Sequence, residues 1–425
     1  MAATTTAART QESRKAPLTA RPLRCRNCAA ERSAAPLAIC ERCLGPLDPV
    51  YQPGRRLPDR TTIAARPPSL WRYREWLPFD GDPVFSLDSG FTPLVESLAL
   101  ARRLGVARVW VKNDTVSHPS LSFKDRVVAA GINAAAAFGL DTIGCASTGN
   151  LANAVAAHAA RAGLKAWIFI PAELEIGKII GTTVYGPKLV RVRGTYDDVN
   201  RLCTQVADRF GWGMVNVNLR AYYGEGSKTL AFEIAEQLGW RLPAAVVAPM
   251  AGGSLVSKLR KGFGELRDAG LVAQAASPPR LYGAQAAGCA PIVRLVERGD
   301  GPLQPETPNT ICRSLAIGNP ADGPLAAQAI RDSGGWGAAV SDDDLVAGMR
   351  ALAEDAGVFA ETAGGVTVAA ALALARAGRL RPDDEVVLCI TGHGLKTVEA
   401  VSGTLPETPV IGPRLKEVAA LAEHG

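Results

Sequence analysis

Lys124 lies in the stretch SLSFKDRVVAAGINAA, where a serine-rich loop is expected to become a helix. Its neighbours Leu121, Phe123, Val127 and Val128 are apolar. Apolar surroundings and the positive end of a helix dipole both disfavour an ammonium group, so both favour a lysine with a lowered pKa. Such a lysine has a nucleophilic amine that can form a Schiff base with a carbonyl compound. Taken alone, Lys124 is more readily explained as an ordinary lysine whose charged end reaches water.

Three other loops combine glycine with polar side chains, and each follows an apolar strand-like run. They are STGN at 147–150, MAGGS at 250–254 and TGHG at 391–394. In parallel sheets, binding sites gather where such loops lead from strands into helices. Paired glycines let backbone N–H groups converge on a phosphate, although AGGS alone is as consistent with a structural turn. The loop has no Walker-type lysine, which disfavours a nucleoside triphosphate.

A Schiff-base lysine, a phosphate-binding loop, an amide and a hydroxyl together describe a site for pyridoxal phosphate. Lys124 supplies the amine, residues 251–255 the phosphate loop, Asn150 the amide and Thr391 the hydroxyl. Single residues have simpler explanations, since Asn150 could cap its helix and Thr391 could be an ordinary strand-end hydroxyl. The combination of the four features predicts this cofactor, and no one motif does.

Beyond about residue 105, apolar strand-like runs alternate with helical stretches, which predicts parallel sheets covered by helices on both faces. The predicted strands are 107–112, 142–147, 165–171, 188–194, 244–250, 280–285 and 385–391. Helices are expected at 150–162, closed by Gly163, and at 196–210. The length of 425 residues and the 43 glycines also favour a layered α/β enzyme with more than one domain.

Four of the nine cysteines form two CxxC pairs, CRNC and CERC, separated by eleven residues. Two tight turns of this kind supply the four thiolates of a tetrahedral zinc site. We therefore predict a zinc ribbon with the ligands Cys25, Cys28, Cys40 and Cys43. Four thiolates leave no open coordination position, so this zinc would be structural. Free thiols or a redox pair are the alternatives. The other cysteines are scattered, which favours a reducing cytoplasm over a disulfide framework.

The net charge of +6 is concentrated at the N-terminus, because residues 1–32 carry +5 and the remaining 393 residues about +1. The body of the chain therefore lacks the positive field of proteins that bind nucleic acids or membranes. No apolar run is long enough to span a bilayer, and the first residues lack the apolar core of a secretion signal. We expect residues 1–22 to be a disordered basic tail, with an organelle transit peptide as the alternative, and the protein to be cytoplasmic.

Five motifs resemble the threonine synthases, which are pyridoxal phosphate enzymes of fold type II (tryptophan-synthase-β-like). They are SFKDR, CASTGN, PMAGGS, SLAIGNP and TGHGLK, in matching order and spacing from about residue 86 to 400. Forms of the family with an N-terminal zinc ribbon extend the resemblance to about residue 23. It implies two parallel-sheet α/β domains with the cofactor between them. We expect the zinc ribbon at 23–48, a small domain at 124–220 and a large domain from 49–123 and 221–425.

The resemblance also implies the roles of the site residues. Lys124 is similar to the lysine that carries the cofactor, Asn150 to the asparagine beside its ring hydroxyl, and Thr391 to the hydroxyl facing its pyridine nitrogen. The cofactor phosphate would lie on Ala251, Gly252, Gly253, Ser254 and Leu255. The substrate carboxylate would lie on Ser147, Thr148 and Gly149.

The implied reaction converts O-phospho-L-homoserine and water to L-threonine and phosphate, with Lys124 moving the protons. Two departures from the family bear on the substrate. The phosphate loop reads AGGS, a form closer to amino-acid dehydratases, and Tyr223 occupies the position of a usual arginine. The candidates for binding the substrate phosphate are Arg220, Asn218, Ser227, Lys228 and Thr148. Lys228 could equally be a solvated helix lysine.

Three kinds of function remain open from the sequence. The favoured one is threonine synthase, expected as a homodimer that acts on a small molecule and has no nucleic-acid or membrane partner. The second is another fold type II lyase, such as a threonine dehydratase or a cysteate synthase-like enzyme, although the TGHG loop argues against a dehydratase. The third is a non-catalytic zinc-ribbon interaction protein, which the intact set of Lys124, Asn150 and Thr391 disfavours.

Overall fold

The computed structural model describes residues 18–52 and 54–424, so most of the predicted tail at 1–22 lies outside the described residues. Residues 18–22 are ordered, which corrects the predicted end of that tail. Strand β1 (Thr19–Ala20) pairs with β5 (Phe79–Asp80), and buried Arg21 forms an ion pair with Asp80 at 2.6 Å. Along the described chain we find no helix with the length and apolar character needed to cross a bilayer.

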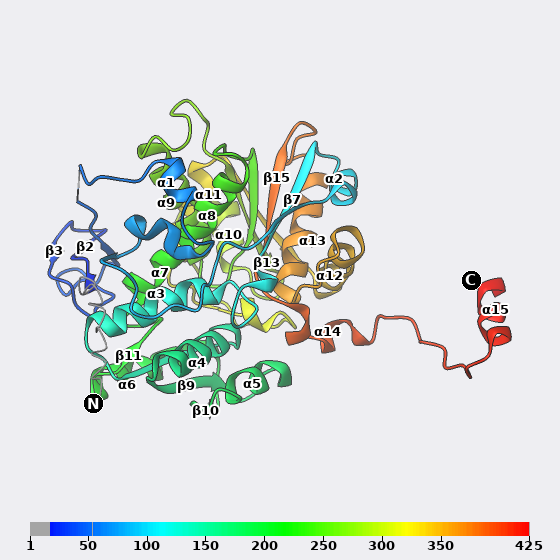
Figure 1. Cartoon of the computed structure of the whole chain (residues 1–425), viewed down its shortest axis with the longest axis horizontal. Helices are drawn as coiled ribbons and strands as arrows, with labels where there is room; N and C mark the ends of the chain where they lie inside the picture. Colours follow the sequence, from blue (N-terminus) through cyan, green and yellow to red (C-terminus); the bar gives the residue numbers. More distant parts are fainter. Residues whose placement is uncertain (1–17, 53, 425) are drawn as a thin grey trace, which may run out of the picture.

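Two separate sheets with parallel strands form the body of the molecule (Figure 1). The six-stranded sheet has the order β14 (Gly337–Val340), β13 (Arg280–Ala286), β12 (Ala245–Pro249), β15 (Glu385–Ile390), β7 (Arg108–Asn113) and β6 (Leu94–Glu96). The four-stranded sheet has the order β10 (Lys188–Val192), β9 (Lys165–Pro171), β8 (Thr142–Ala146) and β11 (Gly213–Met214). Neighbouring strands run parallel except for the antiparallel pair of β6 and β7. The predicted strands are all present, whereas the short β6, β11 and β14 were not predicted.

Helices cover the larger sheet on both faces, as the parallel strands require. One face packs against α2 (Leu98–Leu104) and α13 (Thr362–Arg376), with α12 (Asp342–Ala356) packed on these two helices. The other face packs against α9 (Ser254–Asp268), α10 (Pro291–Arg298) and α11 (Gly323–Asp332). Side chains of β15 alternate between these two cores, since Val386 and Leu388 belong to the first and Val387 to the second. The strand is therefore buried on both sides, which explains its uninterrupted apolar sequence.

The smaller sheet is flanked by α4 (Asn150–Ala162), α5 (Ile176–Thr183) and α6 (Tyr196–Phe210). The predicted bounds of α4 and α6 agree with the structure, because both helices end at glycines in the left-handed conformation, Gly163 and Gly211. Helix α3 (Lys124–Ala137) packs on α4 and on α7 (Arg220–Glu225). The boundary expected after residue 220 falls within α7, one residue from its start.

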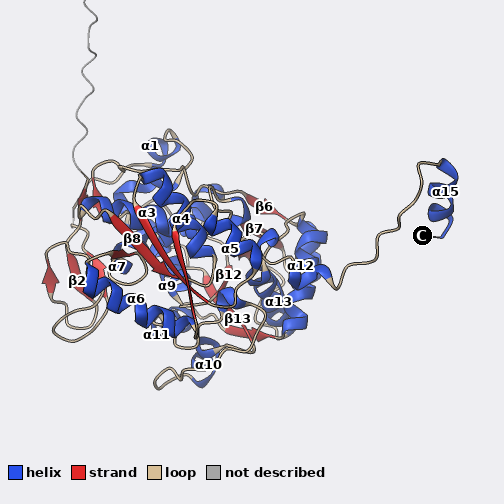
Figure 2. Cartoon of the chain, turned by 90° about the horizontal axis from the view of Figure 1, so that it is seen from below, coloured by secondary structure: helices blue, strands red, loops and turns tan. Residues whose placement is uncertain are grey.

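Shorter elements connect these layers, and the chain ends in a separate arm. They are α1 (Arg60–Ala64), η1 (Leu70–Trp76), η2 (Asp114–Val116), η3 (Gly226–Lys228), α8 (Thr229–Gln237), η4 (Arg313–Leu315), η5 (Gly394–Lys396) and α14 (Glu399–Ser402). Residues 403–414 lead from the body to α15 (Leu415–His424), which stands apart from it in both views (Figures 1 and 2). Near the N-terminus, β3 (Glu31–Arg32), β2 (Leu23–Cys25) and β4 (Leu47–Pro49) form a small antiparallel sheet within the predicted ribbon.

A buried ion network fixes the start of α3. The guanidinium of Arg126, fully buried, donates to Asp114 at 2.7 and 2.8 Å and to Glu233 at 2.8 Å. Lys112, also buried, lies 2.7 Å from Glu233. Burial alone would raise the pKa of Glu233, but Arg126 and Lys112 lower it to about 2. The network therefore ties α3 to β7 of the larger sheet and to η2 and α8.

Replacing Arg126 by methionine removes the cation that neutralises Asp114. Because a buried carboxylate is then left unpaired, we expect the free energy of unfolding to fall by about 3–5 kcal/mol. Urea unfolding followed by circular dichroism measures the loss. Arg103→Met is the matched control, since its pair with Asp355 is 45% exposed on the arginine side and should contribute about 0–1 kcal/mol. Equal losses in the two variants would contradict the assigned role of Arg126.

Candidate active site

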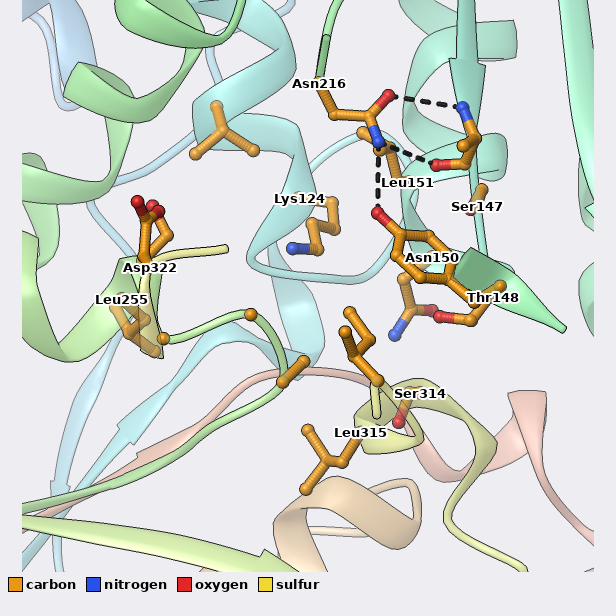
Figure 3. Close-up of a pocket in the computed structure, with 18 of the residues that line it drawn as sticks. Lys124, Ser147, Thr148, Asn150, Leu151, Asn216, Leu255, Ser314, Leu315 and Asp322 are labelled. Carbon is orange, nitrogen blue, oxygen red and sulfur yellow. Dashed lines mark hydrogen bonds between the residues drawn. The ribbon is translucent and has the colours of Figure 1, made fainter. Parts of the chain in front are cut away.

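A cavity lies between the two sheets, where the loops after β8, β12 and β15 meet the N-terminus of α3 (Figure 3). Most of the predicted site residues line it together, although they are far apart in the sequence. They are Lys124, Ser147, Thr148, Asn150, Arg220, Ser227, Ala251, Gly252, Gly253, Ser254, Leu255 and Thr391. The carboxyl ends of parallel strands face one edge of a sheet, so the topology itself brings these loops into one place.

Lys124 is the first residue of α3, and its side chain points into the cavity (Figure 3). Burial lowers the pKa of Lys124 to about 8, while the carboxylate of Glu361 acts in the opposite direction. The backbone beside it is held by a hydrogen bond from the Phe123 N–H to the Thr391 carbonyl oxygen, at 2.9 Å. The amine of Lys124 therefore faces the cavity with a lowered pKa.

Asn150 is the first residue of α4 and makes no side-chain cap of its helix. Its amide nitrogen donates to Glu361 Oε1 at 2.6 Å, and its amide oxygen accepts from Lys396 Nζ at 3.1 Å. Both ends of the amide are thus held in one orientation. Glu361 is 1% exposed, and its Oε2 makes no hydrogen bond within the described residues. The capping alternative for Asn150 is therefore wrong.

The loop after β12 leaves space for an anion at the start of α9. Gly253 has φ of +89°, and a β-carbon there would lie 2.7 Å from the Asp322 carbonyl oxygen. A residue without a side chain is therefore needed, both for the left-handed backbone and for the contact. Helix α9 begins at Ser254 and presents its N-terminal N–H groups to the cavity, which suits a phosphate.

Polar residues that the sequence did not predict complete the cavity wall. They include Tyr196, Asn216, Asp322 and Glu361. The Asn216 side chain accepts from the Ala146 N–H at 3.2 Å and donates to the Tyr196 hydroxyl at 3.2 Å, as Figure 3 shows. Burial raises the pKa of Tyr196 to about 12, so its hydroxyl stays protonated. No local motif surrounds these residues, so sequence spacing alone offered no signal for them.

The candidates for the substrate phosphate are not all placed at the cavity. Arg220 lines it and forms an ion pair with Asp322 at 2.7 Å. Asn218 and Lys228 are not among the lining residues, which corrects their predicted substrate contact. Asn218 bonds to the backbone of Met214 and Trp212. Lys228 is buried in a separate ion cluster, so it is not a solvated lysine either.

Gly149 is also not among the residues that line the cavity. It is the residue directly before α4. Ser147 explains the loop's shape, because its hydroxyl accepts from the N–H groups of Gly149 at 2.9 Å and Ala152 at 2.8 Å. Thr148, in the middle of the loop, lines the cavity together with Ser147 and Asn150. The two hydrogen bonds to the Ser147 hydroxyl hold the turn from the loop into α4.

The four predicted metal ligands converge in the ribbon. The sulfur atoms of Cys25, Cys28, Cys40 and Cys43 all lie within 4.8 Å of one another. Two of the distances are 3.4 and 3.7 Å, close to the roughly 3.8 Å between thiolates around a tetrahedral zinc with Zn–S bonds of about 2.3 Å. Backbone N–H groups of Arg42 and Cys43 lower the pKa of Cys40 to about 6, which favours its thiolate. The donor set and spacing fit one metal ion.

Residues 85–392 match the protein family described as "Pyridoxal-phosphate dependent enzyme". The chain belongs to this family. Several threonine synthases are similar to this pyridoxal-phosphate dependent enzyme along most of its length. That of Methanosarcina acetivorans is 33% identical over 399 residues, covering 93% of this chain and 97% of the relative. That of Synechocystis is 35% identical over 355 residues, covering 80% of this chain and 87% of the relative.

Solved structures of the family share the fold. A fungal L-serine ammonia-lyase from Rhizomucor miehei aligns with a TM-score of 0.64 at 22% identity, over 74% of this chain and 97% of that one. Threonine deaminase isoform 2 from Solanum lycopersicum aligns with a TM-score of 0.60 at 20% identity, over 79% and 84%. The predicted fold class, a fold type II pyridoxal phosphate enzyme, is confirmed. The cavity fits that cofactor, because it combines the Lys124 amine with a phosphate cradle at α9.

The rate at which the cofactor-free enzyme takes up pyridoxal phosphate should rise with pH and be half-maximal near pH 8, because only the unprotonated Lys124 amine attacks the aldehyde. Glu361→Gln removes a carboxylate that raises this pKa, so the midpoint should move to lower pH. Stopped-flow absorbance across a pH series measures both. Glu354→Gln, an exposed glutamate on α12, is the control and should leave the midpoint unchanged. An upward shift in Glu361→Gln would contradict the electrostatic assignment.

Proposed function

We propose that this enzyme is a threonine synthase, which converts O-phospho-L-homoserine and water to L-threonine and phosphate. The observation that carries the proposal is the 33% identity to the Methanosarcina acetivorans threonine synthase over nearly the whole of both chains. The cavity supports it with two cationic groups, Lys124 and Arg220, and with a separate phosphate cradle at α9. A substrate with its own phosphate needs a cationic partner besides that cradle.

Pyridoxal phosphate, when bound, supplies an electron sink for the carbon that carries the substrate amino group. Residues 251–255 would hold its phosphate at the N-terminus of α9, Asn150 would lie beside its ring hydroxyl, and Thr391 would face its ring nitrogen. Thr391 is a neutral hydroxyl, so it does not enforce protonation of that nitrogen as an aspartate would. The loop Ser147–Gly149 would bind the substrate carboxylate, with Thr148 as its side-chain contact.

Lys124 is the residue that moves protons in this proposal. Its amine, with a pKa lowered to about 8, can accept a proton near neutral pH from the α-carbon of the substrate. It gives that proton up before it accepts the next one, from the β-carbon. Phosphate leaves the γ-carbon, which takes up a proton, and the oxygen of water bonds to the β-carbon while one proton of that water is released with the phosphate. A proton returned to the α-carbon completes the product. The buried carboxylate of Glu361 stabilises the protonated amine between these transfers.

Arg220 is the proposed partner of the substrate phosphate. Its guanidinium lies on the cavity wall and is oriented by Asp322, from the segment that also packs against Gly252 and Gly253. Tyr223, on the same helix, lines the cavity where related enzymes have an arginine. Arg220 lies about one helical turn before it and can take over that charge. Ser227 and Thr148 are the proposed hydroxyl donors beside it.

A panel of amino acids tests the proposed activity directly. The purified enzyme should release phosphate and threonine from O-phospho-L-homoserine, and Lys124→Ala should lose both the turnover and the visible absorbance of lysine-bound cofactor. Liquid chromatography of the products separates threonine from 2-oxobutanoate. Formation of 2-oxobutanoate from threonine, without turnover of the phosphorylated substrate, would identify a dehydratase instead.

Arg220→Ala should lower kcat/KM for O-phospho-L-homoserine by roughly thirty- to a thousand-fold, since a lost charge-assisted contact to a dianion typically costs about 2–4 kcal/mol. The visible spectrum should stay normal, because the cofactor phosphate lies on other residues. Steady-state phosphate release measures the change. Arg201→Ala, an exposed arginine on α6, is the control. Near-normal kinetics in Arg220→Ala would remove Arg220 from the site.

Four further assignments belong to the proposal. We propose that the four cysteines of the ribbon bind structural zinc, on the basis of their converging sulfur atoms, and metal analysis of the purified protein tests this. We also propose a homodimer, which sedimentation equilibrium tests, and a cytoplasmic location, which cell fractionation tests.

We also propose the division into a small domain at 124–220 and a large domain. The two sheets support it, because all strands of the four-stranded sheet lie within 124–220 and all strands of the six-stranded sheet lie outside that range.

A further inference from the structure

A largely buried cluster of charged side chains joins the cysteine ribbon to the two helices beside the cavity. Its members come from the ribbon, from α7 and η3, and from α9. They are Arg26, Asp48, Glu225, Lys228, Lys258, Lys261 and Glu265. None of them lines the cavity, and the reaction proposed above uses none of them. The cluster is therefore available for another role.

Glu225 is the centre of the cluster and is fully buried. Its carboxylate accepts from Lys228 at 2.7 Å and from Lys261 at 2.9 and 3.0 Å, and it also accepts from Lys258. The Tyr51 hydroxyl donates to it as well. Burial would raise the pKa of Glu225, but the three ammonium groups hold it well below its usual range. Glu225 is thus a buried anion whose geometry is set by cations from two helices.

Asp48 connects this centre to the ribbon. Arg26, which lies between Cys25 and Cys28, donates to both oxygens of Asp48 at 2.6 and 2.8 Å. The same carboxylate accepts from Lys258 Nζ at 3.1 Å. Asp48 belongs to β4, whose residue Leu47 pairs with Cys25 of β2. Two consecutive ion pairs, Arg26 with Asp48 and Asp48 with Lys258, therefore link the metal-binding turn to α9.

Helix α7 has one face in the cavity and the other against the ribbon. Arg220 and Tyr223 line the cavity. Tyr222 is buried on the other face, where its hydroxyl donates to the Arg21 carbonyl oxygen at 3.1 Å and accepts from the Ala35 N–H at 3.3 Å. Glu225, at the end of the helix, belongs to the ion cluster. The ribbon segment thus holds the same short helix at two points.

Helix α9 shares this arrangement, because it begins at the phosphate loop and carries Lys258 about one turn further on. A shift of the ribbon relative to α9 would separate Lys258 from Asp48 and leave a largely buried charge with fewer partners, which is unfavourable. The same shift would disturb Glu225 and, with it, α7. Ion pairs with the ribbon therefore help to fix the positions of α7 and α9, which form two walls of the cavity.

We propose that the metal-binding ribbon positions the cofactor-phosphate loop and Arg220 through Asp48, which makes Asp48 a positioning residue of the active site. The inference rests on the proposed cofactor and substrate sites. It assigns the ribbon a task in the catalytic domain itself, and it requires no other protein or nucleic acid as a partner of the ribbon.

Asp48→Asn tests the proposal in the full-length enzyme, since it keeps the shape of the side chain and removes its charge. We expect the dissociation constant of pyridoxal phosphate to rise about ten-fold, the size of effect typical of coupling between linked sites. The ³¹P resonance of the bound cofactor should move, and the metal content should equal that of the wild type. Asp48→Glu should restore part of the affinity.

Glu31→Gln is the matched control, because it breaks the exposed ion pair of Arg24 and Glu31 on the same ribbon without touching the cluster. It should leave cofactor affinity and the ³¹P resonance unchanged. Unchanged values in Asp48→Asn, or equal changes in Glu31→Gln, would overturn the proposal. The wild-type enzyme is measured alongside. If it binds pyridoxal phosphate and turns over substrate, the proposed function stands even when the role of Asp48 is overturned.

Hydrogen exchange of the wild type provides a test that does not depend on the variant folding. Removing the metal with a chelator should speed amide exchange in residues 220–225 and 254–261 while leaving β9 unchanged, because only the former are tied to the ribbon. Unchanged exchange in both segments after complete metal removal would overturn the proposal.

Discussion

The position of Lys124 depends on the two charged residues that follow it. Arg126 is buried between Asp114 and Glu233, which ties the first turn of α3 to η2 and α8. Asp125 accepts from the Ser120 N–H at 3.0 Å and from the Ser120 hydroxyl at 2.8 Å, which closes the preceding loop. Since both neighbours are held by buried charge, the backbone of Lys124 has little freedom. Its own ammonium takes no part in that network, so the amine is left for chemistry.

The polar groups of the cavity are held by residues behind them. Asn150 is oriented by Glu361 and Lys396, and Asn216 by the backbone of Ala146 and the Tyr196 hydroxyl. Groups that are already oriented need no reorganisation when charge develops during a reaction, which is the main physical source of electrostatic catalysis. The Glu361 carboxylate can reach Asn150 only because residue 392 has no side chain: a β-carbon on Gly392 would lie 2.3 Å from Glu361 Oε1.

Buried charge also explains how a ribbon of three very short strands can belong to the catalytic unit. Such strands bury little apolar surface, so a metal site is the usual means of stabilising them. Here ion pairs of Asp48 with Arg26 and Lys258 connect the first CxxC turn to helix α9. Helix α7 contacts the ribbon segment through Tyr222 and lines the cavity with Arg220 and Tyr223, so ribbon and site share one short element.

The sequence by itself determined the elements and the local motifs. Apolar runs and glycine caps depend on neighbouring residues, which is why seven of the ten strands in the two sheets and the bounds of α4 and α6 could be predicted. The CxxC pairs and the position of Lys124 at the start of α3 could be predicted for the same reason, since they too depend on neighbouring residues. The tertiary structure alone decided the partners of these residues. Asn150 meets Glu361, 211 residues away, and Lys228 is buried against Glu225 and Glu265 instead of reaching the cavity. Such contacts depend on how helices pack across two sheets, and no spacing along the chain encodes that packing.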